Sequence, residues 1–264
     1  MKFKLDNGYL AFDQLGSGIP VLFIHGYPLS RKIWQSQISG LSDIAHIITV
    51  DLRGHGESYP FEPPYTMDML AEDCKQLLDS VDIKAPLVIC GLSMGGYVTM
   101  ALYRKYPQLF AAMILTSTRA VADSPVGKAN REAAIKNVRE HGVSYIADGM
   151  LPKTVSPATL ASKPQLVKGI RDIMLETSVQ GVVGASMGMR DRPDSTSTLA
   201  KASCPVLIIH GADDQIIPLS ESQAMQVQIP NSKLVAIPQG GHLANMEQPE
   251  AFNQAVREFI QPLA

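Results

Sequence analysis

Residues 87–96 read LVICGLSMGG, an apolar run followed by a serine between glycines. The run predicts a buried parallel strand over Leu87–Cys90, and the residues after the serine predict a helix over Met94–Tyr106. A strand that turns into a helix within one residue needs strained backbone at Ser93, and side chains two positions to either side would clash with the neighbouring strand and helix. Gly91 and Gly95 occupy these two positions, so neither clash arises. The turn would hold the Ser93 hydroxyl exposed, where an adjacent base can activate it as a nucleophile.

Two backbone N–H groups are candidates to stabilise an oxyanion formed at Ser93. The predicted helix begins at Met94, so its free N–H groups and the positive end of its dipole point at the space above the serine. The apolar run Val21–Ile24 predicts another strand, and the segment HGYP follows it. The N–H of Tyr27 in that segment would be the second donor. The alternative is that HGYP is only a strand-ending turn.

A second GxSxG pattern, GASMG at residues 184–188, is centred on Ser186. No strand-like run bounded by turn residues precedes it, because residues 176–180 are polar and mixed. We therefore predict that Ser186 is a helix or loop residue in an inserted region, without a catalytic role. Strand context favours Ser93 as the nucleophile.

Composition and charge limit the class of protein. With 264 residues, of which 45% are hydrophobic, the chain can bury one large core and has room for an inserted subdomain. The 23 basic and 25 acidic residues give a net charge of -2, which argues against nucleic acid or an anionic membrane as a partner. A small neutral or weakly charged molecule fits better as the substrate. The sequence leaves the oligomeric state open.

The cysteines and the N-terminal residues predict a cytoplasmic protein. Cys74, Cys90 and Cys204 are odd in number and widely spaced, so we expect reduced thiols and a reducing compartment. The first residues, MKFKLDNGYLAFD, contain no apolar signal segment. No apolar run approaches the length of a membrane span.

Alternating strand-like and helix-like segments predict the fold. An antiparallel hairpin is expected first, with strands over Lys2–Leu5 and Tyr9–Asp13 around a turn at residues 6–8. The later strand-like runs are Val21–Ile24, Ile47–Val50, Leu87–Cys90, Met113–Leu115, Pro205–Ile209 and Lys233–Ile237. The helix-like stretches are Ile33–Leu41, Thr66–Ser80, Met94–Tyr106 and Pro249–Gln261. This alternation predicts an α/β fold with a mostly parallel central sheet and helices on both faces.

Between residues 119 and 200 the alternation stops. Helical periodicity there, in Ala129–Glu140 and Gln165–Leu175, is interrupted by glycines and prolines. We predict a helical cap over residues 119–200, inserted into a core domain formed by residues 1–118 and 201–264. The cap contains four methionines, Met150, Met174, Met187 and Met189. Their flexible thioethers would either fill its core or line an adaptable apolar pocket.

Two arginines lie near the end of the predicted cap, in GMRDRPD at residues 188–194. Arg190 and Arg192 could pair with a carboxylate on a substrate. Because Asp191 and Asp194 are adjacent, we expect a local group of salt bridges instead.

A catalytic serine needs a base, and the chain has six histidines. His242 follows the predicted strand over Lys233–Ile237 through the flexible turn PQGG, which can place its imidazole over the sheet edge. We predict that His242 is the base. His210 ends an apolar strand and is expected to be a satisfied packing residue, and His55 in a glycine-rich turn is expected to be structural or to support the site. Solvated side chains are expected for His46 and His141.

The base in turn needs a carboxylate that orients it. The segment GADDQIIP places Asp213 and Asp214 just beyond the strand that ends near Ile209, and either side chain could reach the sheet edge. The strand over Met113–Leu115 is followed by Thr, Ser and Thr, so that alternative position holds no acid. Neither HExxH nor a cluster with metal-ligand spacing occurs, and no dinucleotide glycine pattern follows the first sheet strand. We expect no metal and no cofactor.

Five segments in this order resemble the α/β-hydrolase superfamily over nearly the whole chain: HGYP at 25–28, DLRGHGES at 51–58, GLSMGG at 91–96, GADDQIIP at 211–218 and GGHLANMEQPEAF at 240–252. The resemblance implies an order of nucleophile, acid and base that Ser93, Asp214 and His242 match. It also implies Asp214 rather than Asp213 as the acid, because the family's carboxylate lies three residues after the glycine.

Within that superfamily, HGYPLSRKIW is similar to a segment of aryl esterases and cofactor-free haloperoxidases, and GGHLANMEQPEAF is similar to carboxylesterases and 3-oxoadipate enol-lactonases. Dehalogenases and epoxide hydrolases of this fold carry aspartate at the turn, so Ser93 argues against both. We expect a serine hydrolase that cleaves carboxylic esters of short or medium acyl chains, or aryl esters, through an acyl-enzyme. Hydrolysis of enol-lactones or of carbon-carbon bonds, perhydrolysis, and ligand sensing without turnover remain open.

Overall fold

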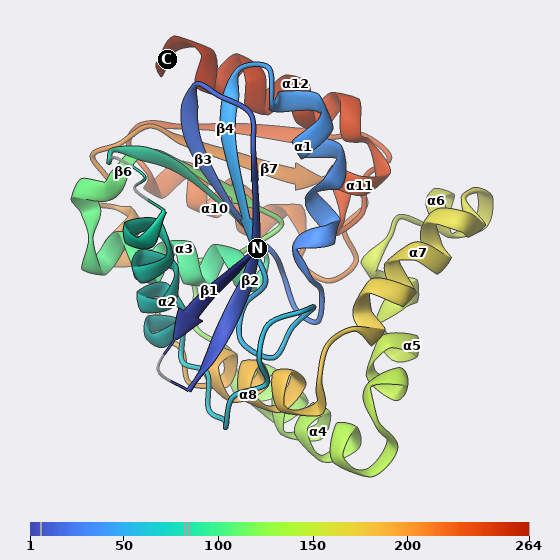
Figure 1. Ribbon diagram of the computed structural model, residues 1–264. Coiled ribbons are helices and arrows are strands. Elements are labelled where there is room, and N and C mark those ends of the chain that lie inside the picture. The colour runs from blue at the N-terminus through green and yellow to red at the C-terminus, as the bar shows by residue number, and fades with distance from the viewer. Residues whose placement is uncertain (6, 82, 84, 264) are drawn as a thin grey trace.

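An eight-stranded sheet crosses the computed structural model, which describes residues 1–5, 7–81, 83 and 85–263 (Figure 1). The strands are β1 Lys2–Leu5, β2 Gly8–Leu15, β3 Ile19–Ile24, β4 Ala45–Val50, β5 Leu87–Leu92, β6 Phe110–Thr116, β7 Val206–Gly211 and β8 Ser232–Ile237. Their order across the sheet is β1-β2-β4-β3-β5-β6-β7-β8. β2 pairs antiparallel with β1 and β4, and the remaining neighbours are parallel. The prediction of a mostly parallel α/β sheet is confirmed.

The strand order reverses at β3, which precedes β4 and β5 in the chain but lies between them in the sheet. Parallel strands end at one common edge. In open α/β sheets the ligand site lies outside the carboxyl ends of the strands, at such a reversal. A ligand site is therefore expected at the loop after β3 and the turn after β5.

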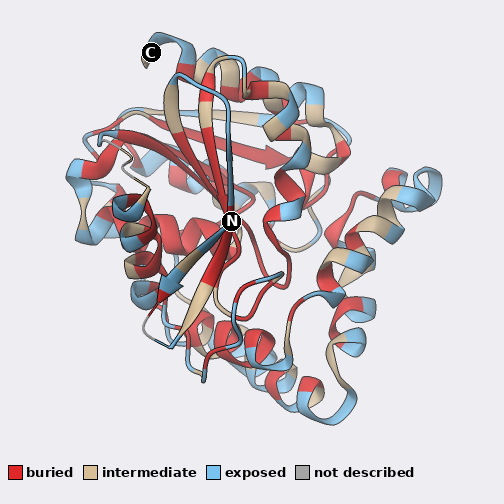
Figure 2. Ribbon diagram, viewed as in Figure 1, coloured by how far each residue is buried: buried red, intermediate tan, exposed pale blue. Residues whose placement is uncertain are grey.

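Helices cover both faces of the sheet, and Figure 2 shows the strands between them as largely buried. Those from the predicted core segments are the 3-10 helix η1 Arg31–Trp34, α1 Gln35–Leu41, α2 Met67–Ser80, α3 Met94–Lys105, α10 Leu219–Gln228, α11 Ala244–Glu247 and α12 Pro249–Ile260. α2 and α3 share one buried apolar cluster with Leu87 and Ile89, whereas α1 and α12 share the other with Val88 and Cys90. Alternate residues of β5 thus serve opposite faces, as the pleat of a strand requires.

Some element boundaries differ from those that the sequence predicts. The expected helix over Ile33–Leu41 is divided into η1 and α1. The expected hairpin is present as the pair β1 and β2, while Asp6 of its turn lies outside the described residues. The sequence pattern does not predict α10, because its segment LSESQAMQVQ buries only Ser222 and Met225 and has no continuous apolar stripe.

Helices alone connect β6 to β7, in the region predicted as a cap (Figure 1). They are α4 Pro125–His141, α5 Val143–Thr154, α6 Pro157–Ser162, α7 Pro164–Leu175, α8 Val179–Arg190 and α9 Thr196–Leu199. Serine side chains cap the N-termini of α4, α6 and α8 by accepting a backbone N–H three residues later. None of the helices in the described part of the chain combines the length and apolar character needed to span a bilayer. The division of the chain at residues 119 and 200 stays a prediction.

The four methionines of the predicted cap divide between the two roles considered for them. Met174 and Met189 are buried in the core, and Met187 packs against it. Met150 lines a pocket. Core filling is therefore the commoner role, and one thioether faces a cavity.

The second GxSxG pattern lies in α8, where its glycines serve helix packing. A Cβ at Gly184 would lie within 3.0 Å of the Tyr65 ring, and a Cβ at Gly188 would lie within 3.0 Å of the Tyr65 carbonyl. The Tyr65 N–H also donates to the Gly184 carbonyl (3.1 Å). Ser186 between them is fully buried in the helix. The prediction that Ser186 belongs to a helix rather than to a strand-to-helix turn is confirmed.

We expect Gly188→Ala to lower the free energy of unfolding by about 1–3 kcal/mol, since overpacking against fixed backbone forces shifts of this cost. Gly169→Ala in α7 is the matched control, because its Cβ would meet no atom within 4 Å. That replacement should raise stability by about 0.5–1 kcal/mol, as alanine favours a helix. Urea unfolding of both variants checks the pair; equal effects would contradict the packing argument.

Candidate active site

The turn at Ser93 joins β5 to α3 and has the strained backbone that the sequence predicts. Its φ is +54° and its ψ is -111°, a region that residues with a side chain rarely adopt. A Cβ at Gly95 would lie within 3.0 Å of the Ile24 carbonyl of β3, and a Cβ at Gly91 would meet the carbonyl of Gly95 equally closely. Both positions therefore require glycine, and the strain is maintained by the close packing of α3 on the sheet.

The end of β6 fixes both backbone groups of Ser93. Its N–H donates to the Thr116 carbonyl (2.9 Å), and the Thr118 hydroxyl donates to the Ser93 carbonyl (2.8 Å). Neither bond uses the Ser93 side chain. The backbone is thus held at two points while the hydroxyl is left to the site.

Two buried N–H groups beside this turn have no hydrogen-bond partner among the described residues. They belong to Met94, at the start of α3, and to Tyr27, in the loop after β3. The loop contacts the turn, since a Cβ at Gly26 would lie 3.2 Å from the Ser93 Cβ. Buried N–H groups are rarely left unpaired, so two of them near one serine indicate space for a ligand oxygen. Their role as oxyanion donors stays a prediction.

His25 orients the peptide group that carries the Tyr27 N–H. Its Nε2 accepts from the Leu52 N–H (3.0 Å), so its Nδ1 carries the proton and donates to the Gly26 carbonyl (2.7 Å). In a trans peptide the Gly26 carbonyl and the Tyr27 N–H point in opposite directions, so fixing one fixes the other. Burial lowers the pKa of His25 to about 4, which keeps the ring neutral at neutral pH. Sequence reasoning missed this role, because Leu52 lies 27 residues away.

Asp214 and His242 form the pair that the sequence predicts. The His242 Nδ1 lies 2.8 Å from the Asp214 Oδ2, and both side chains are almost fully buried. The Asp214 Oδ1 accepts from the N–H groups of Ile216 (2.8 Å) and Ile217 (3.0 Å). Burial opposes ionisation of this carboxyl, but the interaction with His242 and the hydrogen bonds from Ile216 and Ile217 outweigh it and lower the pKa of Asp214. The carboxylate is therefore ionised at neutral pH.

An ionised Asp214 determines which nitrogen of His242 can act as a base. A carboxylate only accepts hydrogen bonds, so the His242 Nδ1 carries the proton and its Nε2 keeps the lone pair. Asp213 is exposed, and its N–H donates to the Gly240 carbonyl (2.8 Å). The structure thus brings Asp214, and not Asp213, to His242.

His210 is a satisfied packing residue, as predicted, and it also contacts Asp214. Its Nδ1 accepts from the Ser222 hydroxyl (2.7 Å), and its Nε2 donates to the Ile217 carbonyl (2.9 Å). The same Nε2 lies 3.4 Å from the Asp214 Oδ2. Burial lowers the pKa of His210, so a neutral ring stands behind the carboxylate. His210 therefore helps to hold Asp214 without adding a charge.

The remaining histidines lie outside the Asp214–His242 pair. His55 is fully buried, its Nδ1 donates to the Arg53 carbonyl (2.8 Å), and its ring centroid lies 5.1 Å from that of His25. This packing supports the loop after β3, in line with the structural or supporting role expected. His141 is exposed as predicted, whereas His46 is half-buried. Within residues 1–5, 7–81, 83 and 85–263, no three or more His, Cys, Asp or Glu side chains are grouped to hold a metal ion.

Glu247 ties the loop that carries His242 to the predicted cap. Its buried carboxylate accepts from the Gly241 N–H (2.8 Å) through Oε1 and from the Ser156 N–H (2.8 Å) through Oε2. The Leu243 N–H also donates to the Thr154 carbonyl (3.2 Å). The residues on both sides of His242 are thus anchored to the end of α5 and to Ser156, which follows it. Glu247 lies in the segment GGHLANMEQPEAF, but its role cannot be predicted from the sequence, because Ser156 is 91 residues away.

The two arginines of the predicted cap both form ion pairs within the protein. Arg190 forms a salt bridge with the adjacent Asp191, as expected, and a second one with Glu132. Arg192 is buried, and its partner is Asp123 (2.8 Å) rather than one of the adjacent acids. The expectation of salt bridges holds for both residues, but the partner of Arg192 comes from the segment before α4.

A family model described as alpha/beta hydrolase fold matches residues 19–249. The chain belongs to the α/β-hydrolase family. It is similar to 3-oxoadipate enol-lactonase 2 of Acinetobacter baylyi, with 30% identity over 91% of this chain and 88% of that protein. Non-heme chloroperoxidase CPO-A1 of Kitasatospora aureofaciens is 26% identical, with 97% of each chain covered.

Among solved structures of this family, a malate-bound thermophilic esterase from Thermogutta terrifontis is 42% identical. It superposes with a TM-score of 0.94 over 97% of this chain and 94% of its own. The α/β-hydrolase fold that the sequence resemblance implies is therefore confirmed. The relatives are named as lactonase, peroxidase and esterase, so family membership establishes a hydrolase fold and leaves the substrate class to be proposed.

We expect the free energy of unfolding to fall as the pH drops from about 6.5 to 4, in part because of His55. Burial lowers its pKa in the folded protein to about 3, while the unfolded side chain binds a proton near pH 6.5. In that window the unfolded chain holds more protons, so acidification favours unfolding. His55→Asn should reduce the slope of stability against pH by up to about 1.4 kcal/mol per pH unit. Urea unfolding at several pH values tests this, and parallel curves would contradict it.

Proposed function

We propose that the protein is a serine hydrolase that cleaves carboxylic esters of short or medium acyl chains, or aryl esters, through an acyl-enzyme. The observation that carries the proposal is the buried pair of Asp214 and His242, joined at 2.8 Å. In this proposal the Nε2 of His242 acts as the base at the sheet edge, and the strained turn presents the Ser93 hydroxyl to it. A carboxylate, an imidazole and a hydroxyl in this order are the parts that acyl transfer needs.

In the first half of the reaction, the His242 Nε2 takes the proton of the Ser93 hydroxyl as its oxygen attacks the ester carbonyl. Asp214 stabilises the imidazolium that forms and keeps its own negative charge. The tetrahedral intermediate collapses, the bond to the leaving oxygen breaks, and His242 gives its proton to the departing alcohol. The acyl group is then bound to Ser93.

In the second half, His242 takes a proton from water, and the hydroxide attacks the acyl carbonyl. The second tetrahedral intermediate releases the acid, and the proton returns to the Ser93 oxygen. In both intermediates, the N–H groups of Tyr27 and Met94 would bind the oxyanion. The dipole of α3 adds to this stabilisation, since the helix begins at Met94.

The esterase from Thermogutta terrifontis, at 42% identity, supports ester cleavage as the first choice. A lactone is a cyclic ester, so the same steps would open an enol-lactone, and the relative named as an enol-lactonase favours this as the second candidate. Perhydrolysis, hydrolysis of carbon-carbon bonds and ligand sensing would use the same residues. Turnover of a panel of p-nitrophenyl esters, lactones and diketones would rank these activities and separate an enzyme from a sensor.

The predicted cap belongs to the same proposal. Residues 119–200 would shape the substrate pocket, and Glu247 would couple that segment to the His242 loop.

The compartment is proposed from the thiols. Cys74, Cys90 and Cys204 are buried and unpaired, which supports a reducing compartment such as the cytoplasm.

We expect Ser93→Ala to lower kcat for p-nitrophenyl butyrate by at least about 10⁴-fold, as removal of a triad nucleophile does in other serine hydrolases. Ser186→Ala is the matched control, because it removes the hydroxyl of the second GxSxG pattern and should leave kcat within a few fold. Circular dichroism would verify that both variants are folded. Normal turnover by the Ser93 variant would refute the mechanism.

A further inference from the structure

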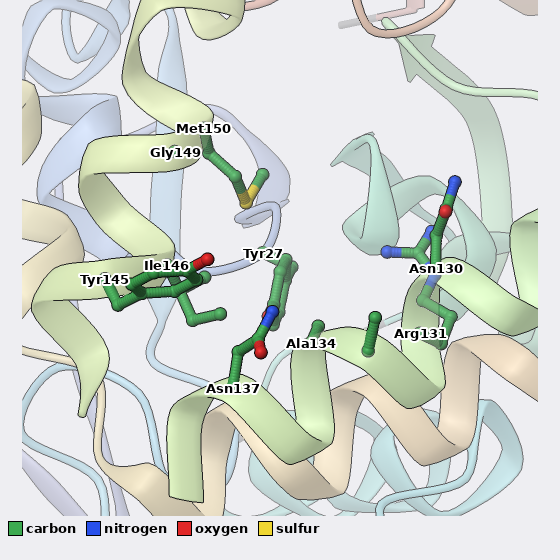
Figure 3. Close-up of a pocket in the computed structure, with 10 residues that line it drawn as sticks. Tyr27, Asn130, Arg131, Ala134, Asn137, Tyr145, Ile146, Gly149 and Met150 are labelled. Carbon is green, nitrogen blue, oxygen red and sulfur yellow. The ribbon is translucent and has the colours of Figure 1, made fainter. Parts of the chain in front are cut away.

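A pocket of about 300 Å³ opens between α4 and α5, and apart from Tyr27 the residues that line it take no part in the proposed reaction (Figure 3). Tyr27 lies at its centre, between Arg131 of α4 on one side and Ile146 and Met150 of α5 on the other. Ser93 and His242 are not among the described residues that line it. The pocket is therefore a neighbouring subsite rather than the reacting centre.

Tyr27 connects this pocket to the proposed oxyanion site. Its ring lines the pocket, while its backbone N–H is one of the two unpaired donors near Ser93. A substrate whose carbonyl oxygen lies at that N–H has one of its ends close to the Tyr27 ring. The pocket is thus placed to bind a part of the substrate that does not react.

The pocket is lined by one positively charged side chain, whose acidic partner is shared with a second arginine. In the described part of the chain, Arg131 is the one charged residue among those lining the pocket. Its Nε donates to Asp123 (3.1 Å), but the same carboxylate also pairs with Arg192 (2.8 Å). One acid is thus shared by two guanidinium groups. The neighbouring acid Glu132 is engaged by Arg190.

Neutral donors accompany this charge. The Ser186 hydroxyl donates to the Tyr27 phenol oxygen (3.4 Å), which leaves the phenol proton for a ligand. Burial raises the pKa of Tyr27, although the Ser186 bond and the charge of Arg131 act against it, so the phenol stays protonated. The side-chain amide of Asn137 lines the same pocket as Tyr27. A guanidinium and nearby O–H and N–H donors suit a carboxylate better than an alkyl group.

The wall of the pocket formed by α5 is largely apolar, with Tyr145 as its polar side chain among the described lining residues. Ile146 and Met150 from α5 face Ala134 of α4 across the cavity. A ligand that fills it needs an apolar stretch with an anionic end near Arg131. A plain alkyl ester would leave the guanidinium without a partner inside the pocket.

We propose that this pocket binds the carboxylate of an ester substrate that carries one on an apolar spacer, and that Arg131 is the specificity-determining residue. This inference rests on the proposed function, because it names a substrate class for the same site. The carboxylate can belong to the acyl part or to the leaving group, since both are attached to the reacting carbonyl. Arg131 takes no part in bond breaking and acts through binding.

Paired esters test the inference. The acyl arm compares p-nitrophenyl hydrogen glutarate with p-nitrophenyl pentanoate, and the leaving-group arm compares 4-carboxyphenyl butyrate with phenyl butyrate. We expect Arg131→Gln to lower the ratio of kcat/KM for the anionic over the neutral ester about tenfold in at least one arm, as loss of a charge-assisted hydrogen bond does. Arg131→Lys keeps the charge and should recover part of the ratio.

Arg139→Gln is the matched control, because Arg139 lies exposed on the same helix and does not line the pocket. For Arg139→Gln, the ratio of kcat/KM for the anionic over the neutral ester should equal that of the wild type. Neutral esters should be cleaved within about twofold by every variant, which shows that the fold is intact. An unchanged ratio in both arms for Arg131→Gln, with neutral turnover retained, would overturn the inference.

Binding of free glutarate separates this inference from the proposed function. If the wild type cleaves none of the four esters, the proposed function fails, and calorimetry with glutarate decides the pocket independently. Binding that is weakened at least about tenfold by Arg131→Gln and unaffected by Arg139→Gln would support the pocket. Equal binding by the wild type and Arg131→Gln, or binding by neither, would overturn it.

Discussion

The contact between α3 and β3 at Gly95 is the constraint on which the site depends. Because a Cβ there would collide with the Ile24 carbonyl, only glycine allows the helix to lie this close to the sheet. This closeness forces the chain to turn at Ser93 with φ at +54°, and it aims the first N–H groups of α3 at the loop after β3. If α3 lay farther from the sheet, the turn would relax, and both Ser93 and the unpaired Met94 N–H would move out of their positions in the site. The strain is therefore a consequence of packing rather than a separate feature.

Around this turn, buried polar groups hold the partners from three directions. His25 fixes the peptide that presents the Tyr27 N–H, Asp214 fixes the ring of His242, and Glu247 fixes the loop that carries that ring. Each buried group has its hydrogen bonds satisfied by backbone or by another member of the site, as low-dielectric surroundings require. The hydrogen bonds that Glu247 and Thr154 accept also tie the site to the junction of α5 and α6, so movement of that junction would shift His242.

Much of the fold and part of the site are predictable from sequence because their signals are local. Apolar runs fix the strands, and glycines at fixed distances from Ser93 fix the turn. Asp213 and Asp214 cannot be separated by local reasoning, since both follow β7. The N–H groups of Ile216 and Ile217 turn the Asp214 side chain inward, and that geometry appears only in three dimensions. The roles of His25, Glu247 and Arg131 escape prediction because their partners or their pocket are assembled from segments far apart in the chain, and α10 escapes because its apolar periodicity is weak.

The central claim is that Ser93, activated through His242, is the residue that becomes covalently modified. A fluorophosphonate reacts with such a serine and mimics the tetrahedral intermediate, so peptide mapping by mass spectrometry after labelling tests the claim directly. The account predicts one modification, on the peptide containing Ser93, and its loss in unfolded protein. Labelling at Ser186, or no labelling of the folded protein, would contradict it.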